Sequence, residues 1–224
     1  MSTEKMIIAI DGPAASGKGS IARELADRFG FAYLDTGKLY RLIGLNVLNQ
    51  NIDPENDDAA TKVAQELVSY FRPDYLDNPD LGLDEAGNAA SQVAVHHGVR
   101  EALIELQRQF PDTIDAKGAV IDGRDIGTVI FPDADIKFFV TADLEERARR
   151  RFKELERKGH EADYEAIYQD MKQRDERDSG RAHAPTAKAD DAIELDTTSL
   201  SVEEAADKIA PYILKLSKKS SQKA

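Results

Sequence analysis

The chain has 224 residues and no cysteine, and its 30 basic and 42 acidic side chains give a formal net charge of −12. The length suits one domain with small inserts, and the lack of cysteine excludes a disulfide framework, a cysteine nucleophile and a cysteine-ligated metal. The negative charge argues against a partner that is a nucleic-acid polymer, and no apolar run approaches the ~18 residues of a membrane span. With no apolar leader segment either, we expect a cytoplasmic protein.

Five short apolar segments, most of them rich in β-branched residues, predict buried strands. They are Met6–Ile10, Phe31–Leu34, Ala119–Ile121, Ile136–Val140 and Ala192–Leu195. Segments with helical periodicity lie between and after them, at 18–29, 39–47, 59–71, 89–110, 143–158, 164–178 and 201–216. The alternation of strands and helices predicts an α/β domain with a mainly parallel sheet.

Three local features refine this assignment. His96-His97-Gly98 is a possible interruption of the helix at 89–110, and both histidines are expected at the surface. Ser201 with Glu204 three residues later has the spacing of a capping box. Residues 217–224 are expected to form a disordered tail.

A glycine-rich loop separates the first strand from the first helix. Its spacing, Gly-x4-Gly-Lys, is that of a phosphate-binding loop, with Gly19 in the usual Ser/Thr place and the hydroxyl at Ser20. Backbone N–H groups and the start of the helix would surround a phosphate chain, and the Lys18 ammonium would reach the β- and γ-phosphates. The loop therefore predicts a nucleoside triphosphate site formed by Gly12, Pro13, Ala14, Ala15, Ser16, Gly17, Lys18, Gly19 and Ser20.

A second group of polar residues follows the strand at 119–121. The sequence Asp122-Gly123-Arg124-Asp125 places a guanidinium beside carboxylates at the carboxyl end of a strand, where open α/β sheets bind ligands. Asp122 either helps to position Mg²⁺ or serves only as a turn former. Ser20, directly or through water, is the other candidate metal contact.

Arginine is concentrated near the end of the chain, where eight of the 15 arginines lie between residues 147 and 181. Arginine binds phosphate oxygens with a planar fork and offsets charge during phosphoryl transfer. The alternative is a solvated helix face with salt bridges, which we expect for about half of these arginines. Two charged helices around the link at 159–163 suggest a lid that closes over the triphosphate.

The order and spacing of these pieces resemble the bacterial cytidylate kinases, a branch of the nucleoside monophosphate kinases. The resemblance covers most of residues 6–205, and its most specific parts are Asp-Gly-Arg-Asp-x-Gly-Thr at 122–128 and Arg-Asp-x-Arg-Asp-x-x-Arg at 174–181. It also includes Asp35-Thr36-Gly37 with Tyr40-Arg41, Asn88 to Ala94, Val99-Arg100, Phe131 to Ala134 and Glu146-Arg147-Ala148.

The resemblance implies a P-loop kinase fold. It would have a five-stranded, mainly parallel sheet flanked by helices, in a single domain over 1–216 with an acceptor-binding insert at about 38–110 and a lid at about 147–181. The implied activity is transfer of the γ-phosphoryl group of ATP, with Mg²⁺, to CMP or dCMP. We expect a monomer.

The resemblance also assigns site residues. Arg41, Arg124 and Arg181 match the arginines around the monophosphate, and Thr36 matches a residue of the acceptor pocket. The residues that would contact the cytosine are Ser91, Arg100 and Asp125. The residues near the ribose would be Arg174 and Asp178. The residues expected to act in transfer are Lys18, Arg124, Arg174 and Arg181, and the lid arginines expected to bind ATP are Arg150, Arg151 and Arg157.

Two other functions stay open at this stage. The protein would be a kinase for another acceptor, such as UMP, or a nucleotide-binding switch that hydrolyses its ligand slowly. A switch specific for guanine would carry the motif Asn-Lys-x-Asp, and the chain lacks this motif.

Overall fold

The computed structural model describes residues 5–221. The strands form one sheet in the order β2-β3-β1-β4-β5, and every neighbouring pair is parallel. The predicted sheet is confirmed, and its five strands are β1 (Met6–Asp11), β2 (Ala32–Asp35), β3 (Gly118–Gly123), β4 (Ile136–Thr141) and β5 (Ile193–Asp196).

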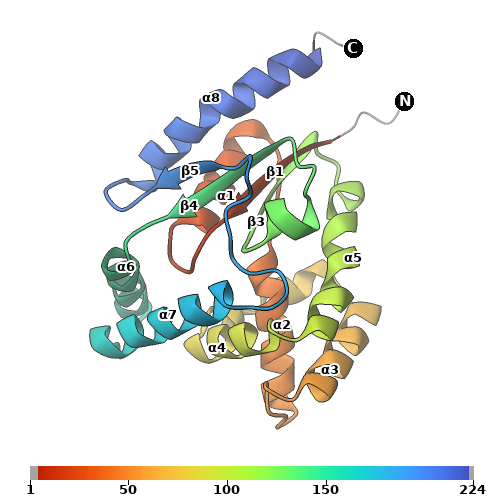
Figure 1. Ribbon diagram of the computed structural model, residues 1–224, viewed down its shortest axis with the longest axis vertical. Helices are drawn as coiled ribbons and strands as arrows, with labels where there is room; N and C mark the ends of the chain where they lie inside the picture. Colours follow the sequence, from red (N-terminus) through yellow and green to blue (C-terminus); the bar gives the residue numbers. More distant parts are fainter. Residues whose placement is uncertain (1–4, 222–224) are drawn as a thin grey trace.

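Helices cover both faces of the sheet and extend beyond its carboxyl edge (Figure 1). They are α1 (Lys18–Phe29), α2 (Thr36–Asn49), α3 (Asp57–Ser69), α4 (Asp84–Val93), α5 (His97–Thr113), α6 (Leu144–Arg157), α7 (Tyr164–Ser179) and α8 (Val202–Ser221). Short helical turns are η1 (Pro73–Asp77), η2 (Pro79–Gly82) and η3 (Ile126–Ile130). None of the helices within 5–221 is long and apolar enough to cross a membrane.

Alternating side chains of the strands enter two cores, one on each face of the sheet. Ile8 and Ile10 of β1 pack with α1 and α8, whereas Ala9 packs with η3 and the end of α5. A third core lies among α2, α3, α4 and α5 and is separate from the sheet. This arrangement places α2, α3 and α4 beyond the carboxyl edge of the sheet, where α7 packs against α4 (Figure 1).

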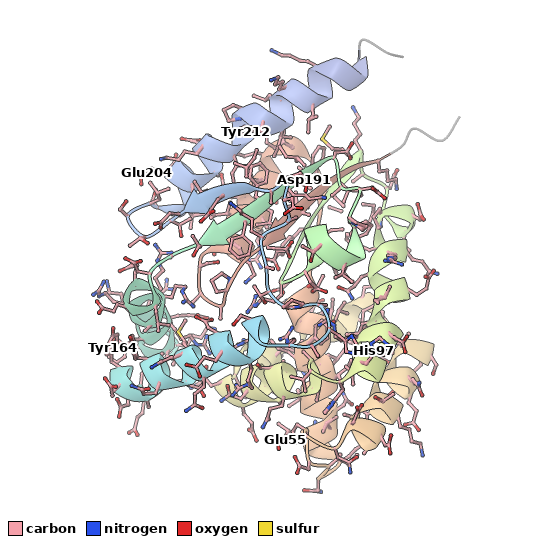
Figure 2. The ribbon with its side chains drawn as sticks, viewed as in Figure 1. Glu55, His97, Tyr164, Asp191, Glu204 and Tyr212 are labelled. Atoms are coloured by element: carbon pink, nitrogen blue, oxygen red, sulfur yellow. The ribbon has the colours of Figure 1, made fainter. Side chains whose placement is uncertain are left out.

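Helix predictions hold with two corrections. The segment 89–110 forms two helices, because the chain leaves α4 after Val93 and His96 has the extended conformation of an N-cap for α5. The prediction that His96 lies at the surface is wrong. His96 is 8% exposed, and its Nε2 lies 2.8 Å from the backbone oxygen of Pro54. His97 is exposed, as expected (Figure 2).

The last helix follows its predicted start. The backbone N–H of Glu204 donates to Ser201 Oγ at 3.1 Å, and the backbone N–H of Ser201 donates to Glu204 Oε2 at 2.8 Å, which confirms the capping box. The helix continues to Ser221, into the segment expected to be disordered, since nothing in 217–221 breaks a helix. Residues 222–224 of that expected tail lie outside the described residues.

The close contact between α2 and α4 depends on Gly44. A Cβ at this position would lie 2.8 Å from the backbone nitrogen of Ala90 and 2.9 Å from the backbone carbon of Ala89. Because the obstacle is backbone, we expect Gly44→Ala to lower the free energy of unfolding by about 1–3 kcal/mol, despite the better helix propensity of alanine. Urea unfolding measures the change. Asn49→Ala on the exposed end of α2 is the control, and an equal or greater stability of the Gly44 variant would contradict the close packing.

Candidate active site

The phosphate-binding loop forms a tight turn at the carboxyl end of β1. A Cβ on Gly12 would lie 1.9 Å from the backbone oxygen of Val140, and Gly17 has a φ of 89°, so both positions require glycine. Among the described residues, no side chain caps the N-terminus of α1 at Gly17. Its first N–H groups and the positive end of the helix dipole therefore remain available to an anion.

Lys18 lies at the centre of this loop. Its Nζ donates to the backbone oxygen of Pro13 at 3.2 Å, which holds the ammonium over the loop. Burial, together with the nearby guanidinium of Arg124, lowers the pKa of Lys18 to about 7. A bound phosphate would reverse much of this cost, because an adjacent anion stabilises the charged ammonium.

Two carboxylates face the loop from the neighbouring strands. Asp35 ends β2 and is the register partner of Asp122 on β3. The hydroxyl of Tyr33 donates to Asp122 Oδ2 at 3.0 Å, and burial and the charge of Asp35 raise the pKa of Asp122 to about 7. Asp35 also accepts from the backbone N–H of Lys38 at 3.2 Å and so caps α2.

These carboxylates, with the Ser20 hydroxyl, are hard oxygen donors of the kind that Mg²⁺ prefers. A cation would also relieve the repulsion between the two carboxylates, so the residues present fit the metal. In the part of the chain that the structure describes, no group of three or more His, Cys, Asp or Glu side chains could hold a metal ion. A magnesium ion here would therefore take most of its ligands from phosphate and water.

A cavity of about 200 Å³ opens beside Lys18, between α2, α4, the turn after β3 and α7. All nine predicted substrate-binding residues line it: Thr36, Arg41, Ser91, Arg100, Arg124, Asp125, Arg174, Asp178 and Arg181. The structure thus brings together residues that are up to 145 positions apart in the sequence, from Thr36 to Arg181. Their individual roles stay predictions.

Asp178 is the central anion of this cavity. It accepts from Arg124 Nε at 3.0 Å, from Ser91 Oγ at 3.2 Å, and from Arg181. Burial opposes its ionisation, but the arginines prevail and lower the pKa of Asp178 to about 2. Arg100, also in the lining, donates to Asp125, and both side chains are almost fully buried.

Positive charge exceeds negative charge in the cavity. Six cationic side chains line it, against the four carboxylates of Asp35, Asp122, Asp125 and Asp178. Within 5–221, the buried Nε atoms of Arg174 and Arg181 have no hydrogen-bond partner. Burial and the neighbouring Arg124 lower the pKa of Arg174 to about 9. Buried donors and unbalanced positive charge are what a phosphate-binding site requires.

A larger cavity, of about 750 Å³, joins the first one. The phosphate loop lines one side of it, through Ala14, Ala15 and residues 17–20, and the rest of the lining comes from α2, α4, α6, α7 and the turns around η2. Four charged side chains, Lys18, Asp35, Arg41 and Arg174, line both cavities together with Ala14, Ala15 and Gly19, and they mark the place where the two meet. Three predicted loop residues, Gly12, Pro13 and Ser16, line neither cavity.

The three arginines predicted to bind ATP differ in their positions. Arg151 lines the larger cavity, where its Nε donates to Asp84 at 3.0 Å. Arg150 and Arg157 line a separate groove beside α6, and Arg150 donates to the backbone oxygen of Thr197 at 2.5 Å. The expected salt bridges occur on α6, where Arg149 and Arg150 both pair with Glu146.

Among the residues that the structure places at the site, Asp35 and Arg147 had no predicted individual role. Asp35 lines both cavities, and its position at the end of a strand could have indicated this. Arg147 is buried, donates to the backbone oxygen of Ala14 at 3.2 Å and pairs with Asp175 at 2.6 Å. It thereby joins the phosphate loop to α7, and its signal in the sequence was the match of Glu146-Arg147-Ala148, which assigned it no role.

A phosphate loop before the first helix of a parallel sheet, next to a second cavity rich in arginine, defines a P-loop kinase. Comparison with known proteins makes the class more specific: the model of the family "Cytidylate kinase" matches residues 8–215. The chain belongs to the cytidylate kinase family.

The sequences of known relatives are similar to this chain over nearly its whole length. The cytidylate kinase of Paramagnetospirillum magneticum is 52% identical over 200 residues, which cover 89% of this chain and 93% of the relative. That of Rhodospirillum rubrum is 52% identical over 202 residues, with the same coverage. An uncharacterized protein of Eubacterium ventriosum, of known structure, has a TM-score of 0.53 at 18% identity over 93% of this chain and 98% of its own, which supports the fold alone.

Proposed function

We propose that this protein transfers the γ-phosphoryl group of ATP to CMP or dCMP, giving ADP and CDP or dCDP. The observation that carries the proposal is the meeting of two cavities at Lys18, Asp35, Arg41 and Arg174. Direct transfer needs little covalent help from the enzyme, but it needs donor and acceptor phosphates held in line among positive groups. Family membership supports the choice of acceptor.

In this proposal each cavity has one substrate. The larger cavity takes the ATP phosphates on the loop and Lys18, with Arg151 at its edge and with Arg150 and Arg157 beside the rest of the nucleotide. The smaller takes the monophosphate on Arg41, Arg124 and Arg181, with Thr36 near the acceptor and Arg174 and Asp178 near the ribose. The boundaries of the acceptor-binding insert, about 38–110, and of the lid, about 147–181, belong to the same proposal.

Cytosine would be recognised at the buried end of the smaller cavity. Cytosine offers an amino donor together with carbonyl and ring-nitrogen acceptors, and the Asp125 carboxylate, the Arg100 guanidinium and the Ser91 hydroxyl are complementary to that edge. A purine or a 4-oxo pyrimidine would leave a buried polar group unpaired, which is costly in a closed site.

We assign Mg²⁺ as the metal that accompanies ATP, near Asp122 and Ser20. When bound, it neutralises charge on the β- and γ-phosphate oxygens. Asp122 would be held for this role by the Tyr33 hydroxyl, 3.0 Å from its Oδ2. We further propose that the enzyme is monomeric and acts in the cytoplasm, where ATP and free nucleotides are available; light scattering on the purified protein tests the first point.

The proposal is tested by ADP release with a panel of acceptors: CMP, dCMP, UMP and AMP, with water alone as the baseline. Rapid release with CMP or dCMP and slow release with UMP are expected. Equal rates with UMP and CMP would contradict the assignment of the cytosine site. If no acceptor accelerates ADP release beyond the baseline, a slowly hydrolysing nucleotide switch becomes the better explanation.

Arg124→Ala distinguishes the two cavities. Arg124 lines only the smaller one, where its Nε is held by Asp178 at 3.0 Å. Loss of a charged contact to the acceptor phosphate should raise the KM for CMP roughly tenfold to a hundredfold, with a much smaller change in ATP affinity. Steady-state kinetics and calorimetric titration with ATP measure the two effects. Arg149→Ala, which removes an exposed arginine of α6, is the control, and a loss confined to ATP would refute the acceptor assignment.

A further inference from the structure

A buried carboxylate connects the strand before the phosphate loop to the turn after β3. Asp11 is the last residue of β1, directly before Gly12, and is only 4% exposed. Its Oδ1 accepts from the backbone N–H of Ile126 at 2.7 Å, and its Oδ2 accepts from that of Gly127, also at 2.7 Å. Both carboxylate oxygens are therefore used to hold one short turn.

The turn that Asp11 holds carries two residues of the smaller cavity. Arg124 and Asp125 directly precede Ile126 and line that cavity, whereas Asp11 lines neither cavity. The turn also packs closely on Lys137, because a Cβ on Gly127 would lie 3.0 Å from Lys137 Cδ. The position of the turn relative to β1 is thus set by the hydrogen bonds to Asp11 and by packing against the Lys137 side chain.

Only a carboxylate satisfies both N–H groups at this position. An asparagine has one acceptor oxygen, and its NH₂ group would face the second N–H donor. The carboxylate is costly to bury: desolvation raises the pKa of Asp11 to about 6, even though the two N–H groups oppose the shift. Among charged groups, Asp125 raises the pKa of Asp11 further and Lys18 lowers it.

We infer that Asp11 is a positioning residue for the acceptor. It sets Arg124 and Asp125 at a fixed place relative to the phosphate loop, so that the acceptor phosphate and the donor phosphate meet in line. The inference rests on the proposed function, because it takes the smaller cavity as the acceptor site. Asp11 directly precedes the phosphate loop, whose residues bind the donor in the proposed function. The inference nevertheless gives Asp11 a role in positioning the acceptor.

Asp11→Asn tests the inference, with Asp135→Asn as the matched control. Asp135 also accepts a backbone N–H of β1, that of Ile7 at 2.7 Å, but it is exposed. Leaving one buried N–H unsatisfied should raise the KM for CMP roughly tenfold and lower kcat, with ATP affinity little changed. Amide hydrogen exchange should show faster exchange over 123–130 in the Asp11 variant and no such change in the control.

Two outcomes of the exchange measurement would overturn the inference. One is unchanged exchange over 123–130, and the other is faster exchange with unchanged kinetics toward the acceptor. A uniform loss of ATP and CMP binding would also count against it, because that pattern indicates general damage. If Asp11→Asn does not fold, Gly127→Ala disturbs the same turn from the side of Lys137 and should give the same selective rise in KM.

Failure of the proposed function is recognised separately. It would appear as the absence of CMP turnover by the unaltered protein in the same assay. The exchange comparison needs no substrate, so it decides whether Asp11 holds the turn in either case.

Discussion

Replacement of Lys18 by alanine is expected to lower kcat about a thousandfold, the scale of losing one strong charge contact to a transferring phosphoryl group. Lys18 lines both cavities at the place where they meet. Its ammonium is held there by the hydrogen bond that it donates to the backbone oxygen of Pro13. The ammonium is therefore already oriented before phosphate arrives. Its contribution should be greatest in the transition state, so kcat should fall more than ATP affinity.

The fold should survive this change. Removing Lys18 relieves the cost of burying an ammonium beside the Arg124 guanidinium, so the free energy of unfolding should stay the same or rise. Single-turnover kinetics and urea unfolding on the same preparation separate the two effects. Lys62→Ala, on the exposed side of α3, is the control. If Lys18→Ala keeps most of the kcat of the unaltered protein, Lys18 does not stabilise the transition state of phosphoryl transfer.

The sheet and most helices could be predicted because their signals are local. Each strand is a short apolar segment, and each helix repeats its apolar residues on one face, so a window of the sequence contains the information. The phosphate loop is local as well, since one stretch of nine residues supplies the glycines, the lysine and the helix start. These are the parts in which the structure and the sequence agree.

Features that depend on distant partners were not predictable in this way. His96 is buried because Pro54, 42 positions earlier, provides an acceptor for its ring nitrogen. The register of β2 with β3 brings Asp35 beside Asp122, and no window of the sequence contains both. The members of the smaller cavity were assigned from a family resemblance, but the arrangement of three arginines around Asp178 comes from the tertiary structure.

The charge of the protein also shows the difference between what the sequence and the tertiary structure reveal. The net charge of −12 conceals a cavity where cationic side chains outnumber carboxylates. Charges on one short segment interact with distant segments after folding, so the local electrostatics of a site follow from topology and not from composition.

Asp178→Asn should be the most destabilising single change at the site. The carboxylate is 3% exposed and is the shared partner of Arg124, Arg181 and, at 3.8 Å, Arg174. Removing the anion leaves buried guanidinium groups uncompensated, which typically costs roughly 3–5 kcal/mol. Urea unfolding should show this loss, and calorimetry should show weaker CMP binding. Glu176→Gln, exposed on the same helix, is the control. A loss as small as that of the control would mean that the arginines do not depend on Asp178.

The pH dependence of stability provides a second measurement on the same variant. The pKa of Asp178 falls from 3.8 to about 2 on folding, because the surrounding arginines favour the carboxylate. A lowered pKa adds stability at pH values above 3.8, and this stability is lost as the pH falls toward 2. The shift corresponds to about 2 kcal/mol. The unaltered protein should therefore lose more stability than Asp178→Asn between about pH 5 and about pH 3. Parallel curves for the two proteins would show that the arginines do not hold this carboxylate in its ionised form.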